Sequence, residues 1–206
     1  AMTFLTLAAE IGGVALALQL LVGIDPRLLV IPVGIAVWLV VWRVRFTVME
    51  NVAGMLGLLL VVFAVALVVL GPDWGALSRQ VVHGVPSSET PLTYAYYAVA
   101  LFGAAMTPYE VFFFSSGAAE ERWTARDLGL SRLNVVVGFP LGGLLSLAIA
   151  GCAAVVLLPR GIDVTSLSQV VLPVATALGV VGLVVVGVGV LAATTGAALE
   201  TGLSCG

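Results

Sequence analysis

Apolar residues are gathered into six long segments, and the stretches between them hold most of the charged residues. About 20 apolar residues are enough for a helix to cross the hydrocarbon core of a bilayer. Five of the segments reach that length, and the second is shorter. The pattern predicts an all-α membrane protein with six transmembrane helices, at residues 3–23, 28–42, 46–70, 91–118, 134–158 and 170–193 or beyond.

The fourth segment carries an interruption at its centre, Thr107-Pro108. Pro108 has no backbone N–H and clashes with the carbonyl four residues back, so the helix is expected to break there. The break frees backbone carbonyls near Ala104, and free carbonyls at membrane depth survive only against protein or a watery cavity. A hydroxyl, a phenol and a carboxyl lie beside it, on Thr107, Tyr109 and Glu110. This combination predicts a binding site for a cation.

Composition supports the membrane assignment, because 61% of the 206 residues are hydrophobic and only 9% are charged. A soluble domain carries about 25% charged residues. The formal net charge of -3, with eight arginines and no lysine, gives no indication of a nucleic-acid partner. The sequence shows no catalytic nucleophile motif, phosphate-binding loop or zinc spacing, so we expect neither an enzyme nor a bound cofactor.

The arginines indicate the orientation in the membrane. Five of them lie in the loops after the second and fourth segments, and three lie in the other loops. Cytoplasmic loops carry the excess of positive residues. We therefore expect a multi-pass protein of the cell membrane with both ends of the chain in the cytoplasm.

One further acid, Glu10, lies inside the first apolar segment. Charged groups are costly within a membrane, so such a residue is a functional candidate by default. Glu10 is either a proton carrier or acid lining an ion path, or a residue near the interface that is reached by water or paired with an arginine. The sequence leaves both interpretations open.

The chain opens almost directly into a spanning segment and stops soon after the last one. We therefore expect residues 1–206 to form one transmembrane transporter domain that is part of a larger one. The partner that this interpretation requires is a set of N-terminal helices that carry the other half of the cation site.

The fourth segment resembles the sixth helix of the Nramp family of divalent metal-ion transporters (natural resistance-associated macrophage proteins). An Ala-x-x-Met-Pro-His pattern interrupts that helix, and here the stretch contains Ala104, Thr107, Pro108 and Tyr109. The run 9–13 looks like part of the family's third helix, which makes the six segments similar to family helices three to eight. The resemblance implies a leucine-transporter-type fold of two inverted repeats, with substrate bound between two broken helices. The first broken helix, with its Asp-Pro-Gly-Asn motif, does not occur in this chain.

Carried over by position, the resemblance makes the Ala104 carbonyl a metal ligand and puts Thr107 in place of the family's metal-binding methionine. Tyr109 takes the place of the histidine, and Glu110 stands where the family usually has asparagine. Glu10 matches an acid of the third helix that is associated with the proton route. The acid that many members carry three residues earlier is leucine here, and this loss, with that of the histidine, weakens the case for proton coupling.

The change at Thr107 alters the expected ion. A methionine thioether is a soft ligand that suits transition metals, whereas a threonine hydroxyl is a hard oxygen ligand that suits magnesium and accepts manganese. The resemblance, so modified, implies membrane transport of Mg²⁺ or Mn²⁺ in preference to softer metals, by alternating access. Two other functions are kept as alternatives: an ion-coupled transporter of a small organic solute such as an amino acid on the same fold, and a non-transporting membrane scaffold or sensor.

Overall fold

The computed structural model describes residues 2–83, 90–105, 108–120 and 122–205, and these residues form helices and connecting turns with no strand. The α-helices are α1 Met2–Val22, α2 Pro26–Arg43, α3 Phe46–Gly57, α4 Val62–Leu70, α5 Trp74–His83, α6 Pro91–Ala105, α7 Pro108–Glu120, α8 Leu128–Leu133, α9 Phe139–Val156 and α10 Leu167–Cys205. Short helical turns join some of them, namely η1 Leu58–Val61, η2 Ala125–Asp127, η3 Asn134–Gly138 and η4 Leu158–Arg160.

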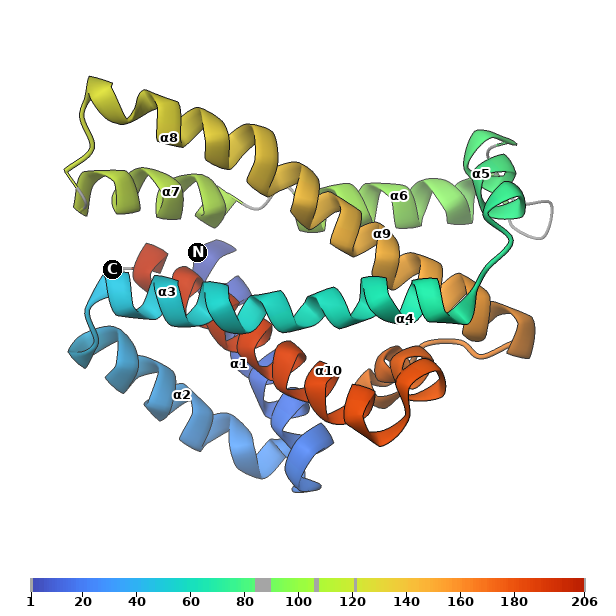
Figure 1. Cartoon of the computed structure of the whole chain (residues 1–206). Helices are drawn as coiled ribbons and strands as arrows, with labels where there is room; N and C mark the ends of the chain where they lie inside the picture. The colour runs from blue at the N-terminus through green and yellow to red at the C-terminus, as the bar shows by residue number, and fades with distance from the viewer. Residues whose placement is uncertain (1, 84–89, 106–107, 121, 206) are drawn as a thin grey trace.

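Five of the six predicted segments contain a helix long and apolar enough to cross a membrane. In the third segment, α3, η1 and α4 follow one another as a continuous rod from Phe46 to Leu70 (Figure 1). In the fifth segment, the π-helical turn η3 precedes Pro140. Proline has no backbone N–H, so the α-helical hydrogen bond that this residue would donate is missing. The prediction of an all-helical membrane protein is confirmed.

The remaining predicted segment, the fourth, is two shorter helices, α6 and α7. They lie end to end in Figure 1. Two residues separate the last residue of α6 from the first residue of α7. The predicted interruption of this segment is confirmed.

Two features were not anticipated from the sequence. A helix, α5, occupies half of the loop expected between the third and fourth segments, and its first turn is capped by Asp73, whose carboxylate accepts from the Ala76 N–H at 3.0 Å. The last helix, α10, continues to Cys205 and changes direction at Gly179, where φ is 66° and ψ is -151°. It therefore consists of two helical parts, before and after that glycine.

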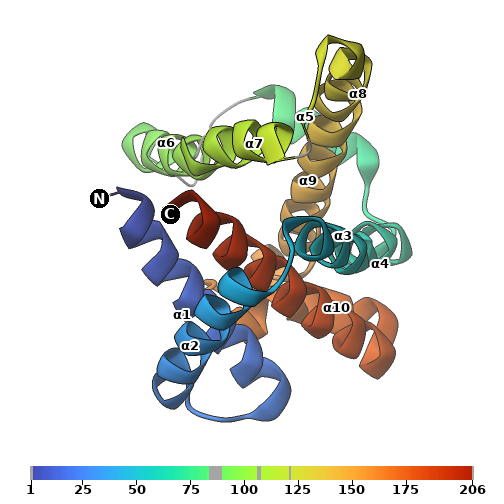
Figure 2. The same cartoon turned by 90° about the vertical axis from the view of Figure 1, so that its left-hand side faces the viewer.

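Helix α10 runs through the middle of the molecule and packs against α1, α2, α3, α4, α7 and α9 (Figures 1 and 2). Its residues belong to two clusters of buried side chains. One cluster joins α4 and α9 to α10 through residues such as Phe63, Cys152 and Val174. The other joins α1, α2 and α3 to the C-terminal part of α10 through residues such as Val14, Val37 and Leu199. A single helix thus connects both parts of the core.

Large apolar side chains cover the outside of the bundle. On α6, for example, Leu92, Val99 and Leu101 are each more than 70% exposed. Such surfaces are unfavourable in water and are the expected surface of a helix that faces lipid or another apolar helix.

Candidate functional site

The candidate cation site is the break between α6 and α7. Helix α6 ends at Ala105 and α7 begins at Pro108. Proline is favoured in the first turn of a helix because its fixed φ suits the helix and its missing N–H would be unpaired there anyway. The same residue that ends one helix therefore starts the next, and the local sequence explains the break without help from packing.

The break exposes two helix ends of opposite polarity. The last four carbonyls of α6, Ala104 among them, have no partner within that helix, and the partial negative charge of a helix C-terminus favours a cation. Tyr109 and Glu110 lie in the first turn of α7. The side chains of these three residues, and all of Thr107, lie outside the described part of the chain. The end of α6 thus leaves acceptor oxygens at the break, whereas cation binding there and the role of the Thr107 hydroxyl stay predictions.

Helix α7 packs against α10, near the C-terminal end of the chain (Figures 1 and 2). That end of α10 carries polar residues that the sequence analysis did not select. Glu200 is half-buried, and Thr201 is fully buried with no hydrogen-bond partner for its Oγ1 among the described residues. These residues were missed because the last predicted segment, 170–193 or beyond, was given no definite end. The uninterrupted helical continuation through Glu200 is the signal that could have revealed them.

Glu10 lies on α1 and is half-buried. Helix α1 runs antiparallel to the second part of α10, as three close approaches show. A methyl group added at Gly13 would lie 3.7 Å from Thr194 Cγ2, and one added at Gly202 would lie 3.9 Å from Leu7 Cδ1. A Cβ at Gly187 would lie 2.7 Å from Leu21 Cδ2. Glu10 therefore sits between two contact levels of the α1–α10 pair rather than at the end of the helix.

The structure does not place Glu10 at the break. Among the described elements, α1 packs closely with α10 and α2, whereas α7 packs closely with α10. Helix α1, which carries Glu10, and helix α7, the C-terminal half of the broken segment, thus both pack on α10. A link between Glu10 and the break would pass through α10, whose Glu200 and Thr201 lie on the part beside α7.

The described residues contain no group of three or more His, Cys, Asp or Glu side chains that could hold a metal ion. The side chains of Thr107 and Glu110 lie outside the described residues, so a cation site at the break stays a prediction.

Comparison with protein families matches residues 1–205 to the family described as natural resistance-associated macrophage protein-like. No curated protein and no solved structure matches the chain. The match extends over the α-helices of the described residues, including the broken pair α6 and α7. The resemblance inferred from the broken segment is confirmed: the chain belongs to the Nramp family, which consists of membrane transporters with a leucine-transporter-type fold and implies divalent metal-ion transport.

Proposed function

We propose that this protein carries Mg²⁺ or Mn²⁺ across the cell membrane by alternating access, and that the ion binds at the break between α6 and α7. The observation that carries the proposal is the break itself. It interrupts an otherwise apolar segment in a chain whose family transports divalent metal ions. Broken helices in transporters of this fold bind substrate and coupling ions near the middle of the bilayer.

The proposed ligands from this chain are the Ala104 carbonyl and the Thr107 hydroxyl. Both are hard oxygen donors, and neither favours cadmium over magnesium as a thioether would. Magnesium gives up its water molecules reluctantly, so a site with few protein ligands suits an ion that keeps part of its hydration shell. Selectivity for a hard ion would then rest on the residue at position 107.

Three further residues have proposed roles beside the ligands. Tyr109 and Glu110, in the first turn of α7, would line the path to the ion, with Glu110 attracting cations. Glu10 would act on a separate proton or ion path along the α1–α10 interface, and its half-buried position supports this role.

Both ends of the chain are proposed to face the cytoplasm. The start of α1 and the end of α10 lie near each other, on the side of the molecule that holds α7 (Figures 1 and 2). The distribution of arginines between the loops supports the same orientation.

The test is ion uptake into proteoliposomes that contain the full-length protein and enclose a pH-sensitive dye. Magnesium, manganese and cadmium are offered separately to the wild type and to Thr107→Met. We expect uptake of magnesium or manganese by the wild type without acidification of the interior, and a shift toward cadmium in the variant, because a thioether prefers the softer ion.

Thr107→Ser is the matched control, since it keeps the hydroxyl, and it should keep the preference of the wild type. An unchanged preference in Thr107→Met would show that position 107 does not set selectivity. No uptake of any metal would contradict the proposal and favour the transport of an organic solute, for which labelled amino acids are the next substrates to test.

A further inference from the structure

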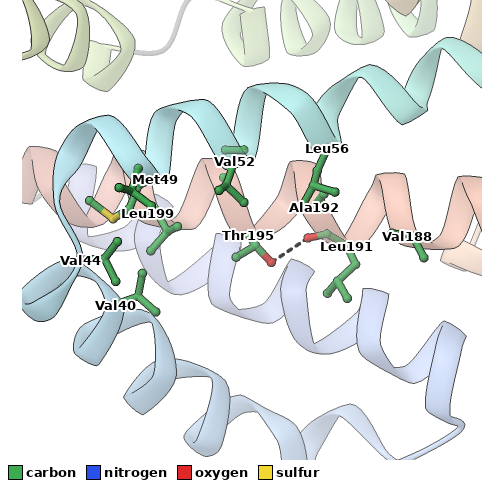
Figure 3. A pocket seen from close by; sticks show the side chains of 13 residues that line it. Val40, Val44, Met49, Val52, Leu56, Val188, Leu191, Ala192, Thr195 and Leu199 are labelled. Atoms are coloured by element: carbon green, nitrogen blue, oxygen red, sulfur yellow. Dashed lines mark hydrogen bonds between the residues drawn. The ribbon is translucent and has the colours of Figure 1, made fainter.

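A groove of about 420 Å³ lies between α2, α3 and the second part of α10, away from the broken segment (Figure 3). Its walls come from all three helices, and the residues that matter most for its chemistry are Val44, Met49, Val52, Leu56, Leu191 and Thr195. It is open to the outside of the bundle, because Val52 is 51% exposed and Leu56 is 40% exposed.

The groove presents almost only hydrocarbon. Its one hydroxyl, on Thr195, donates to the Leu191 carbonyl of its own helix at 2.7 Å, which is the dashed line in Figure 3. That bond satisfies the hydroxyl and leaves the methyl group of Thr195 as its apolar contribution. The occupant is therefore expected to be apolar along its length.

Two arginines flank a residue at one end of the groove. Val44, which lines it, lies in the chain between Arg43 and Arg45, and both arginines are exposed. The guanidinium carbon of Arg43 lies 4.5 Å from the centre of the Trp42 ring, and Trp42 stacks on Trp38 at 5.6 Å. Tryptophan is enriched at the level of the lipid headgroups, and arginine there attracts anionic lipids.

The length of the groove matches one leaflet. Along α3 its wall extends from Val48 to Leu56. At about 1.5 Å per residue these eight steps cover about 12 Å. Half of a hydrocarbon core of about 30 Å is about 15 Å. A chain that starts at the arginines and follows the groove would thus extend through most of one leaflet and stop before its centre.

We propose that this groove binds one acyl chain of an anionic phospholipid, whose phosphate is held by Arg43 and Arg45. The apolar walls select hydrocarbon, the opening to the side admits it from the bilayer, and the two arginines at one end select a negative headgroup. The site is separate from the proposed cation site, so it does not depend on the transport proposal.

The test is native mass spectrometry of the full chain, titrated with phosphatidylglycerol and with phosphatidylcholine of identical acyl chains. The wild type should retain phosphatidylglycerol in preference. Arg43→Gln and Arg45→Gln should each reduce that preference about fivefold, since one arginine near an anionic surface contributes about that factor. Arg27→Gln is the matched control, because Arg27 is exposed at the opposite end of α2.

A second pair of variants tests the groove itself. Val52→Trp fills the groove from its exposed side and should lower the retention of phosphatidylglycerol. Val68→Trp adds the same ring to α4, where Val68 is 68% exposed and does not line the groove, and should leave retention unchanged. Equal retention of both lipids, or retention unaffected by Val52→Trp, would overturn the proposal. A dimer abolished by Val52→Trp, with no lipid retained, would also overturn it and identify the groove as a protein interface.

Discussion

At the scale of single residues, Gly179 determines the course of α10. Its φ of 66° with ψ of -151° lies in a region that is open almost only to glycine. A Cβ at this position would meet no atom within 4 Å, so any cost of a side chain there comes from the backbone alone. The two parts of α10, and with them both clusters of the core, depend on this conformation.

We therefore predict that Gly179→Ala destabilises the protein by about 1–3 kcal/mol, the usual cost of holding a residue in such a conformation. The measurement is thermal denaturation of the purified protein in detergent. Gly12→Ala is the control, because Gly12 lies within α1, where a Cβ also meets no atom within 4 Å. It should be neutral or slightly stabilising, as alanine is the better helix former. Equal effects of the two changes would rule out a special role for the conformation of Gly179.

The break at Thr107-Pro108 and the bend at Gly179 differ in how the sequence encodes them. Proline breaks a helix by its own chemistry, so the first was predictable from one residue. Glycine allows a bend but does not require one, and α9 and α10 contain other glycines that are helical. Which of them bends is decided by the packing on both sides, and this is why the bend was not predicted.

At the scale of the elements, glycines set how closely α10 approaches its neighbours. A Cβ at Gly189 would lie 3.2 Å from Leu59 Cβ and 3.4 Å from the Leu59 carbonyl carbon, on the turn η1. A Cβ at Gly196 would lie 3.3 Å from that of Ala53 on α3. In lipid, where the hydrophobic effect does not hold helices together, such close packing is a main source of stability.

Gly189→Ala should therefore push α10 from η1 and destabilise the fold by about 1–3 kcal/mol, the usual cost of overpacking. The loss of fluorescence on unfolding in a graded series of denaturing detergent measures it. The matched change is Gly142→Ala in α9, where a Cβ meets no atom within 4 Å and no loss is expected. If Gly189→Ala were as stable as Gly142→Ala, η1 would be able to move away at no cost.

At the scale of the whole molecule, α10 connects the helix of Glu10 to the broken segment. Glu10 lies on α1, the break lies between α6 and α7, and both α1 and α7 pack on α10. The ion proposed to bind at the break, and a proton or ion on the path proposed for Glu10, would then use different routes through one scaffold.

We predict that Glu10→Gln changes the pH dependence of metal uptake and leaves the preference among magnesium, manganese and cadmium unchanged. The reason is that the substitution removes a titratable group away from the proposed ligands. Uptake into proteoliposomes at acidic and neutral pH measures both properties. Glu10→Asp, which keeps the carboxyl group, should keep the pH dependence. A change of ion preference in Glu10→Gln would instead place Glu10 in the ion site.

The sequence by itself determined the membrane class, the positions of the spanning segments and the break. Segment hydrophobicity and the missing N–H of Pro108 are local properties, and they act whatever the rest of the chain does. The family was inferred separately, from the resemblance of residues 104–109 to the Nramp pattern, and the family match over residues 1–205 confirmed it.

Only the tertiary structure decided that α10 is the central helix, that Glu10 lies within the α1–α10 pair and that α2, α3 and α10 leave a groove. The physical reason is that α1, α2 and α10 are apolar on nearly every side. An amphipathic surface helix reveals its buried face through its periodicity, but a helix that is hydrophobic all round does not. Its partners are chosen by the fit of small and large side chains across residues far apart in the chain, and that fit exists only once the helices have come together.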